Sequence, residues 1–202
     1  MTVRVKVCGV TRVEDAQAAV QLGADLVGLN FYTPSPRCIT MERAREIHDA
    51  IGGRAKLVGV FVNAAREYVE ERVDGLKLDL IQFHGDEDEN ELGGWPVPVI
   101  RAFRLRAGDR PDALTATRAE FVLLDTLDPK LYGGTGHARG LAGLSGYDLS
   151  RAFISGGLTA KNVAEAAALR PYAVDVASGV ESAPGIKDSA KLASFIRNAK
   201  SA

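Results

Sequence analysis

Two residues of this chain could move protons, a cysteine and an aspartate that each end a short apolar run. Cys8 follows residues 3–7 and precedes Gly9, and Asp125 ends the run 120–125. A thiol titrates near pH ~8.5, so Cys8 would need a cation, a hydrogen-bond donor or the substrate itself to become a thiolate base. A carboxyl group has a reference pKa of ~3.9, so Asp125 would need desolvation or a nearby negative charge to act as an acid. The pair is a candidate base and acid; the alternatives are a buried inert cysteine and a helix-capping aspartate.

Arg37 is a candidate ligand for a carboxylate, because a guanidinium group offers a planar fork of donors. Residues 34–36, Pro-Ser-Pro, form a stiff segment before it. The alternative is a solvated surface arginine. Cys38 lies in the same loop and has no assigned role. The chain has neither a Cys-x-x-Cys motif nor a resolving cysteine near Cys8 in sequence, which argues against a thiol redox protein.

Four further polar residues lie in short apolar runs of this kind: Lys6, Gln82, His84 and Asp175. His84 could shuttle protons, or it could belong to a satisfied polar network with Gln82. Lys6 shares a strand face with Cys8 by alternation. A buried Lys6 would need a carboxylate partner, for which Asp175 is a candidate by its position alone.

Glycines follow the last two apolar runs. Gly156 and Gly157 come after residues 152–155, and Gly179 comes after residues 172–178. Each lies just before an expected helix start, where backbone amides and a helix N-terminus can approach an anion closely. These glycines predict a phosphate site; the alternative is that they only form turns.

Eight short apolar runs alternate with amphipathic stretches along the whole chain, which is typical of alternating strands and helices. The expected strands are residues 3–8, 25–31, 56–62, 79–84, 98–104, 120–125, 152–155 and 172–178. The expected helical segments are residues 11–22, 40–51, 63–75, a short helix after 86, 110–117, a turn at 147–151, 159–170 and a last helix from 188. Thr11 with Glu14 has the form of a capping box, and Thr40, Asn63 and Asp188 are expected to cap later helices.

Eight strand–helix units of roughly 25 residues predict a single (β/α)8 barrel, a TIM barrel with eight parallel strands, over residues 1–202. Continuous apolar runs suit a parallel sheet that is buried on both faces. The alternative is a doubly wound open sheet, which also alternates strands and helices. Barrel enzymes carry their chemistry at the carboxyl ends of the strands, where the candidate residues lie.

The composition excludes several classes of function. Lys and Arg number 25 against 26 Asp and Glu, a net charge of −1, so no overall field favours nucleic acid or an anionic membrane. Two cysteines do not make a disulfide scaffold or a zinc site. No basic, apolar leader and no long uncharged segment is visible, so we expect a cytoplasmic protein outside the membrane, as a monomer or a homodimer.

Several motifs together resemble the phosphoribosylanthranilate isomerase family of tryptophan biosynthesis, and they occur in the family's order from residue 5 to about residue 188. They are KVCGVT at 6–11, SPR at 35–37, VGVFVN at 58–63, QFHGDE at 82–87, LLD at 123–125, SGGLT at 155–159, NV at 162–163, VDVASGVE at 174–181 and PGIKD at 184–188. Many motifs in one order are much more specific than any one of them.

The resemblance implies an Amadori rearrangement of N-(5'-phosphoribosyl)anthranilate to 1-(o-carboxyphenylamino)-1-deoxyribulose 5-phosphate, the third step from chorismate to L-tryptophan, with no metal and no cofactor. Asp125 would protonate the ribose ring oxygen, and Cys8 would remove the C2' proton of the ring-opened Schiff base. Arg37 would bind the anthranilate carboxylate, and His84 and Asp175 would contact the opened sugar or the anthranilate. The resemblance places the substrate phosphate on amides around Gly156, Gly157, Ser178 and Gly179.

The chain departs from the family at residues 137–146, which are glycine-rich where the family often has a Phe-Asp-Trp segment. Two smaller departures are Ala177, where the family commonly has serine, and Ser155, where it commonly has alanine. Related isomerases of a histidine-pathway aminoaldose use two aspartates, so Cys8 argues against that activity or a double one. A phosphate-binding or scaffold protein without catalysis would leave the candidate acid and base unexplained.

Overall fold

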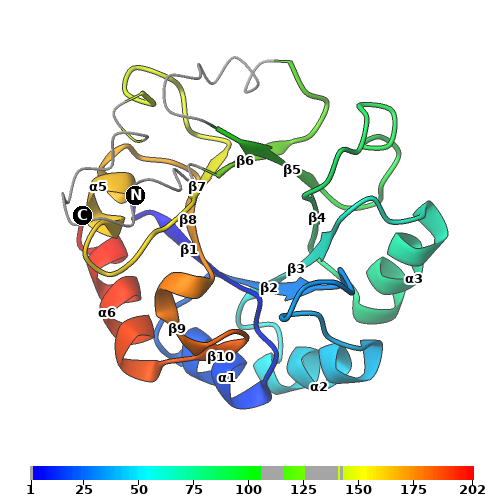
Figure 1. Cartoon of the computed structure of the whole chain (residues 1–202), viewed down its shortest axis with the longest axis horizontal. Coiled ribbons are helices and arrows are strands. Elements are labelled where there is room, and N and C mark those ends of the chain that lie inside the picture. The colour runs from blue at the N-terminus through cyan, green and yellow to red at the C-terminus, as the bar shows by residue number, and fades with distance from the viewer. Residues whose placement is uncertain (1, 106–115, 126–140, 142) are drawn as a thin grey trace.

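The computed structural model describes residues 2–105, 116–125, 141 and 143–202. Eight parallel strands form a barrel in chain order, and helices lie around it (Figure 1). The strands are β1 (Arg4–Cys8), β2 (Leu26–Asn30), β3 (Lys56–Phe61), β4 (Leu80–Phe83), β5 (Val99–Arg104), β6 (Phe121–Asp125), β7 (Ala152–Ser155) and β8 (Ala173–Val176). The helices are α1 (Val13–Gln21), α2 (Met41–Ile51), α3 (Arg66–Leu76), α5 (Val163–Ala168) and α6 (Ser189–Lys200). None of the helices in these residues is long and apolar enough to cross a membrane.

The barrel is closed, because β1 pairs with β8 in parallel. The register places Lys6 opposite Asp175 and Val7 opposite Val176. In an open doubly wound sheet, strands at the two ends would each have one unpaired edge. The predicted (β/α)8 barrel is therefore confirmed, and the open-sheet alternative is wrong.

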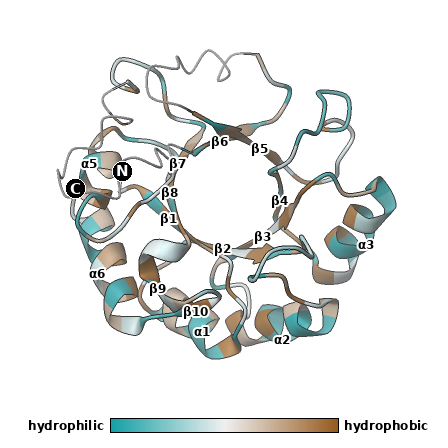
Figure 2. Ribbon diagram, viewed as in Figure 1, coloured by the Kyte–Doolittle hydropathy of each residue, from teal (hydrophilic) through white to brown (hydrophobic). Residues whose placement is uncertain are grey.

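Side chains alternate between two apolar layers along each strand. Val122 and Leu124 pack in the layer that includes the helices, whereas Leu123 packs with Phe153 in a smaller cluster. The smaller cluster therefore fills the barrel interior, and Figure 2 shows hydrophobic colour along the strands and mixed colours around the outer helices. Successive side chains of a strand point to opposite faces. A polar residue whose two neighbours pack in the outer layer therefore points into the barrel.

Two of the expected helix caps are confirmed and two are wrong. Thr40 accepts a hydrogen bond from the amide of Arg43, and Asp188 accepts one from the amide of Lys191. Thr11 does not cap α1, because its hydroxyl donates instead to the carbonyl of Gly185 at 2.6 Å.

Asn63 caps no helix, since α3 begins at Arg66 after Ala65. The side chain of Asn63 accepts from the amide of Asp86 at 2.7 Å, and its backbone has a positive φ of 47°. Thr11 and Asn63, two of the four expected capping residues, therefore bind groups in other parts of the chain instead.

Three helical segments differ from expectation. Residues 84–98, after β4, form turns instead of a short helix, because Gly93, Gly94 and Pro96 follow too closely for it to extend. Residues 147–151 are also not helical; the amide of Ser150 donates to Asp148 instead. The expected helix 159–170 is shorter and begins at Val163. The segment 110–117 and the glycine-rich loop lie largely outside the described residues.

A short hairpin after β8 is not predicted by the sequence pattern. It follows a single 3-10 turn, η2 (Ser178–Val180), and consists of β9 (Glu181–Ala183) and β10 (Ile186–Lys187) in antiparallel pairing. Figure 1 shows it beside α1, next to the end of β1. The hydrogen bond from Thr11 to Gly185 ties it to the loop before α1.

Candidate active site

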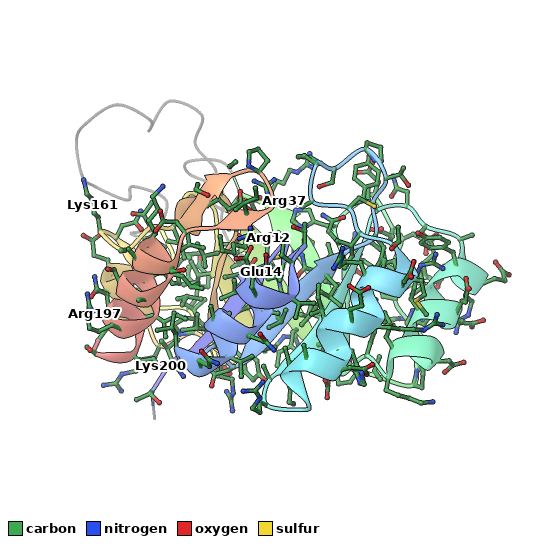
Figure 3. The ribbon with its side chains drawn as sticks, turned by 90° about the horizontal axis from the view of Figure 1, so that it is seen from below. Arg12, Glu14, Arg37, Lys161, Arg197 and Lys200 are labelled. Atoms are coloured by element: carbon green, nitrogen blue, oxygen red, sulfur yellow. The ribbon has the colours of Figure 1, made fainter. Side chains whose placement is uncertain are left out.

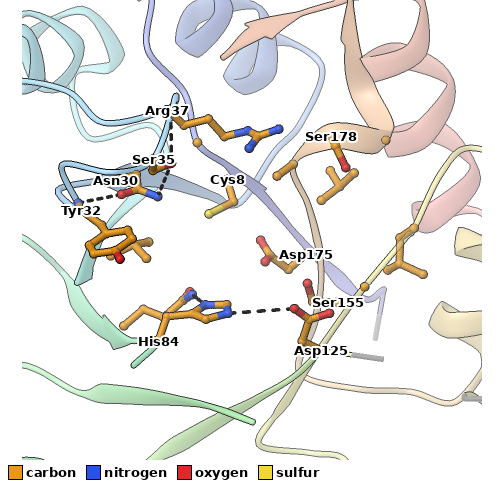
Figure 4. A pocket seen from close by; sticks show the side chains of 18 of the residues that line it. Cys8, Asn30, Tyr32, Ser35, Arg37, His84, Asp125, Ser155, Asp175 and Ser178 are labelled. Carbon is orange, nitrogen blue, oxygen red and sulfur yellow. Dashed lines mark hydrogen bonds and ion pairs between the residues drawn. The ribbon is translucent and has the colours of Figure 1, made fainter. Parts of the chain in front are cut away.

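A cavity of about 430 Å³ lies at the carboxyl ends of the strands, and every site residue predicted from the sequence lines it. These residues are Cys8, Arg37, His84, Asp125, Gly156, Gly157, Asp175, Ser178 and Gly179. Figure 4 shows Cys8, Asp175, Asp125 and His84 projecting toward the same space. The strands of a parallel barrel end at one rim, so residues far apart in sequence meet there.

The cavity also contains polar residues to which the sequence analysis assigns no role. Asn30, Arg104 and Ser155 are the last residues of β2, β5 and β7, and all three line the cavity. The same rule of strand ends would have found them. The Asn30 side chain accepts from the amide of Tyr32 at 2.8 Å, in the loop that leads to Arg37.

Lys6 and Asp175 form a buried ion pair inside the barrel. The Lys6 ammonium donates to the Asp175 carboxylate at 2.9 Å, and the Lys6 side chain has no exposed surface. Burial by itself lowers the pKa of Lys6, but the Asp175 carboxylate and Cys8 raise that pKa overall, so Lys6 stays charged. The partner expected for a buried Lys6 is thus confirmed.

Cys8 lies two residues after Lys6 on the same face of β1. Burial raises the pKa of the Cys8 thiol, and the Asp175 carboxylate raises it further, although Lys6 and Lys187 act in the opposite direction. The raised pKa favours a protonated Cys8 thiol at neutral pH. Lys6, which strand alternation places on the same face, is a cation beside Cys8, but its effect on the thiol pKa does not outweigh that of burial.

Asp125 and His84 are neighbours in the lining of the cavity. The Nε2 atom of His84 lies 4.0 Å from a carboxylate oxygen of Asp125 (Figure 4). Burial lowers the pKa of His84, and Asp125 only partly offsets this, so His84 is neutral at neutral pH. His84 also contacts Gln82, with 3.0 Å between the amide nitrogen and Nδ1.

Arg37 is held by a carboxylate of the protein. Its Nε and Nη2 atoms donate to the two oxygens of Glu181 in β9 at 2.8 and 2.6 Å. Burial raises the pKa of Glu181, but Arg37 and Lys187 outweigh it and lower that pKa, so Glu181 is ionised. Figure 3 shows Arg37 toward the upper edge of the barrel in that view, above Arg12. Glu181 fixes the direction of the Arg37 guanidinium group before any ligand arrives.

Gly9 and Lys187 complete this arrangement. Gly9 has a φ of +66°, and a Cβ atom there would collide with Cδ of Arg37, so only glycine lets Arg37 cross the end of β1. The Lys187 ammonium donates to the Cys8 carbonyl at 2.7 Å and to Glu181 at 2.9 Å. One buried cation therefore joins the backbone of the candidate base to the residue that holds Arg37.

The glycine loops after β7 and β8 lie against each other at the rim. Gly156 and Gly157 have positive φ values of 95° and 61°. A Cβ atom at Gly179 would collide with the carbonyl oxygen of Leu158, whereas one at Gly157 would meet nothing within 4 Å. Because α5 begins only at Val163, backbone amides and not its N-terminus would meet an anion near Gly157.

No group of three or more His, Cys, Asp or Glu side chains in the described part of the chain is arranged to hold a metal ion. The side chains that meet at the rim include groups that can give and accept protons. Cys8 and Asp125 can exchange protons with a ligand in the cavity, and Arg37 and the glycine loops supply hydrogen-bond donors for anionic groups.

Comparison with known proteins gives a consistent result. A family model described as N-(5'phosphoribosyl)anthranilate (PRA) isomerase matches residues 5–198. The N-(5'-phosphoribosyl)anthranilate isomerase of Pseudomonas fluorescens strain Pf0-1 is 50% identical over 198 residues, which cover 96% of this chain and 97% of that protein.

Solved structures agree with this relationship. The phosphoribosyl anthranilate isomerase of Thermotoga maritima has a TM-score of 0.88 and 37% identity, with 99% of this chain and 100% of that one covered. A second structure, with a TM-score of 0.83 and 36% identity over 99% and 100% of the chains, is of the isomerase in complex with reduced 1-(o-carboxyphenylamino)-1-deoxyribulose 5-phosphate.

Proposed function

The chain belongs to the N-(5'-phosphoribosyl)anthranilate isomerase family, and we propose that it converts N-(5'-phosphoribosyl)anthranilate to 1-(o-carboxyphenylamino)-1-deoxyribulose 5-phosphate with Asp125 as general acid and Cys8 as general base. The observation that carries the assignment of these roles is their placement in one cavity, on β6 and β1, beside a neutral histidine and a buried ammonium group. The proposed mechanism uses no metal and no cofactor.

The reaction requires two proton transfers. The Asp125 carboxyl group gives its proton to the ribose ring oxygen while the C1'–O bond breaks and the nitrogen lone pair forms the Schiff base. The Cys8 thiolate then removes the proton from C2', and the electron pair of that bond neutralises the iminium group to form the enolamine. The enolamine tautomerises to the ketone. Asp125 ends as a carboxylate and Cys8 as a thiol, so charge and protons balance.

This cycle starts from the less populated of two proton arrangements. The raised pKa of Cys8 favours a thiol before the substrate binds. A thiolate with protonated Asp125 contains the same number of protons as a thiol with an Asp125 carboxylate, so pH does not change the ratio of the two. The Lys6 ammonium beside Cys8 raises the share of the thiolate form.

Anionic groups of the substrate would bind at the two ends of the cavity. The phosphate would accept hydrogen bonds from amides around Gly156, Gly157, Ser178 and Gly179. The anthranilate carboxylate would meet Arg37, whose Nε and Nη2 already bind Glu181, so the outer edge with Nη1 is the side that serves the ligand. Asp175 and His84 would contact the opened sugar or the anthranilate.

The activity is tested with purified full-length protein and freshly prepared N-(5'-phosphoribosyl)anthranilate in a coupled fluorescence assay. We expect a kcat in the common enzyme range of about 1–10³ s⁻¹. The histidine-pathway aminoaldose, offered at the same concentration, is expected to react at least about 100-fold more slowly, a ratio that binding differences readily produce. Protein that binds phosphate but isomerises neither compound would contradict the assigned activity.

The phosphate site gives a separate prediction. Inorganic phosphate at 100 times its Kd should stabilise the folded protein by about 2.7 kcal/mol and raise its melting temperature. Gly157→Asp should abolish this shift, since its carboxylate would repel the anion. Asp and Asn tolerate a left-handed backbone better than most residues, and a Cβ there has space.

Gly157→Asn is the matched control, with the same shape and no charge. It should keep most of the stabilisation that phosphate gives, while sodium chloride at equal ionic strength should give none of it. An equal phosphate shift in wild type and Gly157→Asp would place the anion elsewhere.

A further inference from the structure

We propose that Gln82 is a positioning residue that holds His84 as the tautomer protonated on Nε2, with that N–H directed at Asp125. The proposal rests on the proposed function, in which Asp125 is the general acid. It adds a residue that acts only through another side chain. His84 would then stabilise the carboxylate that forms when Asp125 gives up its proton.

The contact between Gln82 and His84 determines which ring nitrogen has the proton. The Gln82 amide nitrogen lies 3.0 Å from Nδ1 of His84. An amide nitrogen has only hydrogen atoms to offer, so Nδ1 must accept and the proton of the neutral ring must be on Nε2. The ring is neutral because burial lowers the pKa of His84.

The other side of the ring leads to the same tautomer. Nε2 points toward Asp125 across 4.0 Å (Figure 4). This distance is too long for a hydrogen bond, but it is short enough for a strong electrostatic effect at a partly buried site. An N–H on Nε2 favours the carboxylate form of Asp125, whereas a lone pair there would oppose it.

Packing keeps Gln82 in place. It is 2% exposed and lies on β4 between Ile81 and Phe83, which face the outer apolar layer, so its amide points into the barrel. Neighbouring charges around His84 come in both signs: Asp125 and Asp175 are negative, and Lys6 and Arg104 are positive. Because these charges have both signs, the hydrogen bond from Gln82, and not the net charge around the ring, selects the tautomer of His84.

The unpaired oxygen of Gln82 argues against a purely structural role. Its amide oxygen is buried and has no hydrogen-bond partner among the residues that the structure describes. A buried polar atom without a partner lowers stability, so an apolar side chain of similar shape would suit folding better. The Gln82 amide instead contributes one directed donor, and that donor meets His84.

During the reaction, this tautomer matters when Asp125 gives up its proton to the ring oxygen. The carboxylate that forms faces an N–H donor at once, and no reorganisation of the site is needed. In the other tautomer the Nε2 lone pair would face this carboxylate and oppose it. Because Asp125 is a carboxylate in the favoured resting arrangement as well, the N–H supports the carboxylate before and after the proton transfer, so the variants are compared by the tautomer of His84 and not by kcat.

Two variants of Gln82 separate the functional and structural roles. Gln82→Glu keeps the shape but offers an acceptor to Nδ1, so it should shift His84 to the tautomer protonated on Nδ1. Gln82→Met keeps the length but offers no hydrogen bond, so it should leave a mixture of tautomers. Thermal unfolding should show that Gln82→Met is at least as stable as wild type.

The experiment records ¹⁵N and ¹³C spectra of histidine-labelled full-length protein at neutral pH. His84 is assigned from a His84→Asn sample, and the partly exposed His48 serves as an internal reference whose tautomer should not change. We expect a neutral His84 with its proton on Nε2 in wild type, a neutral His84 with its proton on Nδ1 in Gln82→Glu, and both forms in Gln82→Met.

A His84 protonated on Nδ1 in wild type would overturn the proposal, as would an unchanged tautomer in both variants. If Gln82→Glu does not fold, Gln82→Met alone decides between these outcomes. The spectra need no substrate, so absence of isomerase activity in wild type would contradict the proposed function without affecting the tautomer result.

Discussion

Replacing Cys8 by alanine is expected to lower kcat by about 10²–10⁴-fold, the usual contribution of a general base. Alanine removes the only group that the proposed mechanism uses to take the C2' proton. The change leaves the charges of Lys6 and Asp175 in place, and it removes one sulfur atom at the cavity wall, so the fold and KM should change little. Steady-state kinetics with N-(5'-phosphoribosyl)anthranilate and a thermal unfolding curve measure both parts.

Cys38→Ala is the matched control, since Cys38 does not line the cavity and should be dispensable. Cys8→Ser tests the acidity of the side chain, because a hydroxyl of nearly the same size forms an anion far less readily than a thiol. We expect it to be as inactive as Cys8→Ala. Near-normal turnover by purified Cys8→Ala would remove Cys8 from the mechanism.

The raised pKa of Cys8 also predicts the alkaline side of the pH profile. The productive arrangement, thiolate with protonated Asp125, keeps a constant share as long as the pair holds one proton in total. Above the thiol pKa, that last proton is lost and the share falls. Activity should therefore decline only above the ordinary thiol pKa, because burial raises the value for Cys8.

The barrel could be predicted from the sequence because its signals are local. Each strand is a short apolar run, and a parallel barrel gathers all strand ends at one rim, so the rule of strand ends placed Cys8, Asp125 and His84 in one cavity. The partner of Lys6 was predictable in another way: a buried ammonium group requires a carboxylate, and Asp175 was a candidate by its position.

Interactions between distant segments could not be predicted in the same way. Thr11 has the local pattern of a cap, but its hydroxyl binds Gly185 in a hairpin with no apolar periodicity. The pairing of Arg37 with Glu181 spans 144 residues and depends on that hairpin. Sequence spacing contains no information about such a contact until the barrel has brought both segments to the same edge.

Replacing Asp125 by asparagine is expected to reduce kcat by about 10²–10⁴-fold, because the amide has nearly the same shape but has no acidic proton for the ribose ring oxygen. The phosphate and carboxylate contacts of the substrate lie on other loops, so KM should stay within a few-fold of wild type. His84 would face a neutral amide in place of the carboxylate that now opposes the effect of burial, so the pKa of His84 should fall further.

Asp86→Asn is the matched control, since Asp86 is an exposed carboxylate near the same rim that does not line the cavity. It makes the same chemical exchange and should retain full activity. Stabilisation of Asp125→Asn by phosphate, equal to that of wild type, would show that the variant is folded with an intact anion site, so its lost turnover could be attributed to the missing proton donor. Asp125→Asn with wild-type kcat would instead require another acid, and among the described cavity residues neutral His84, with its N–H on Nε2, is then the group to replace next.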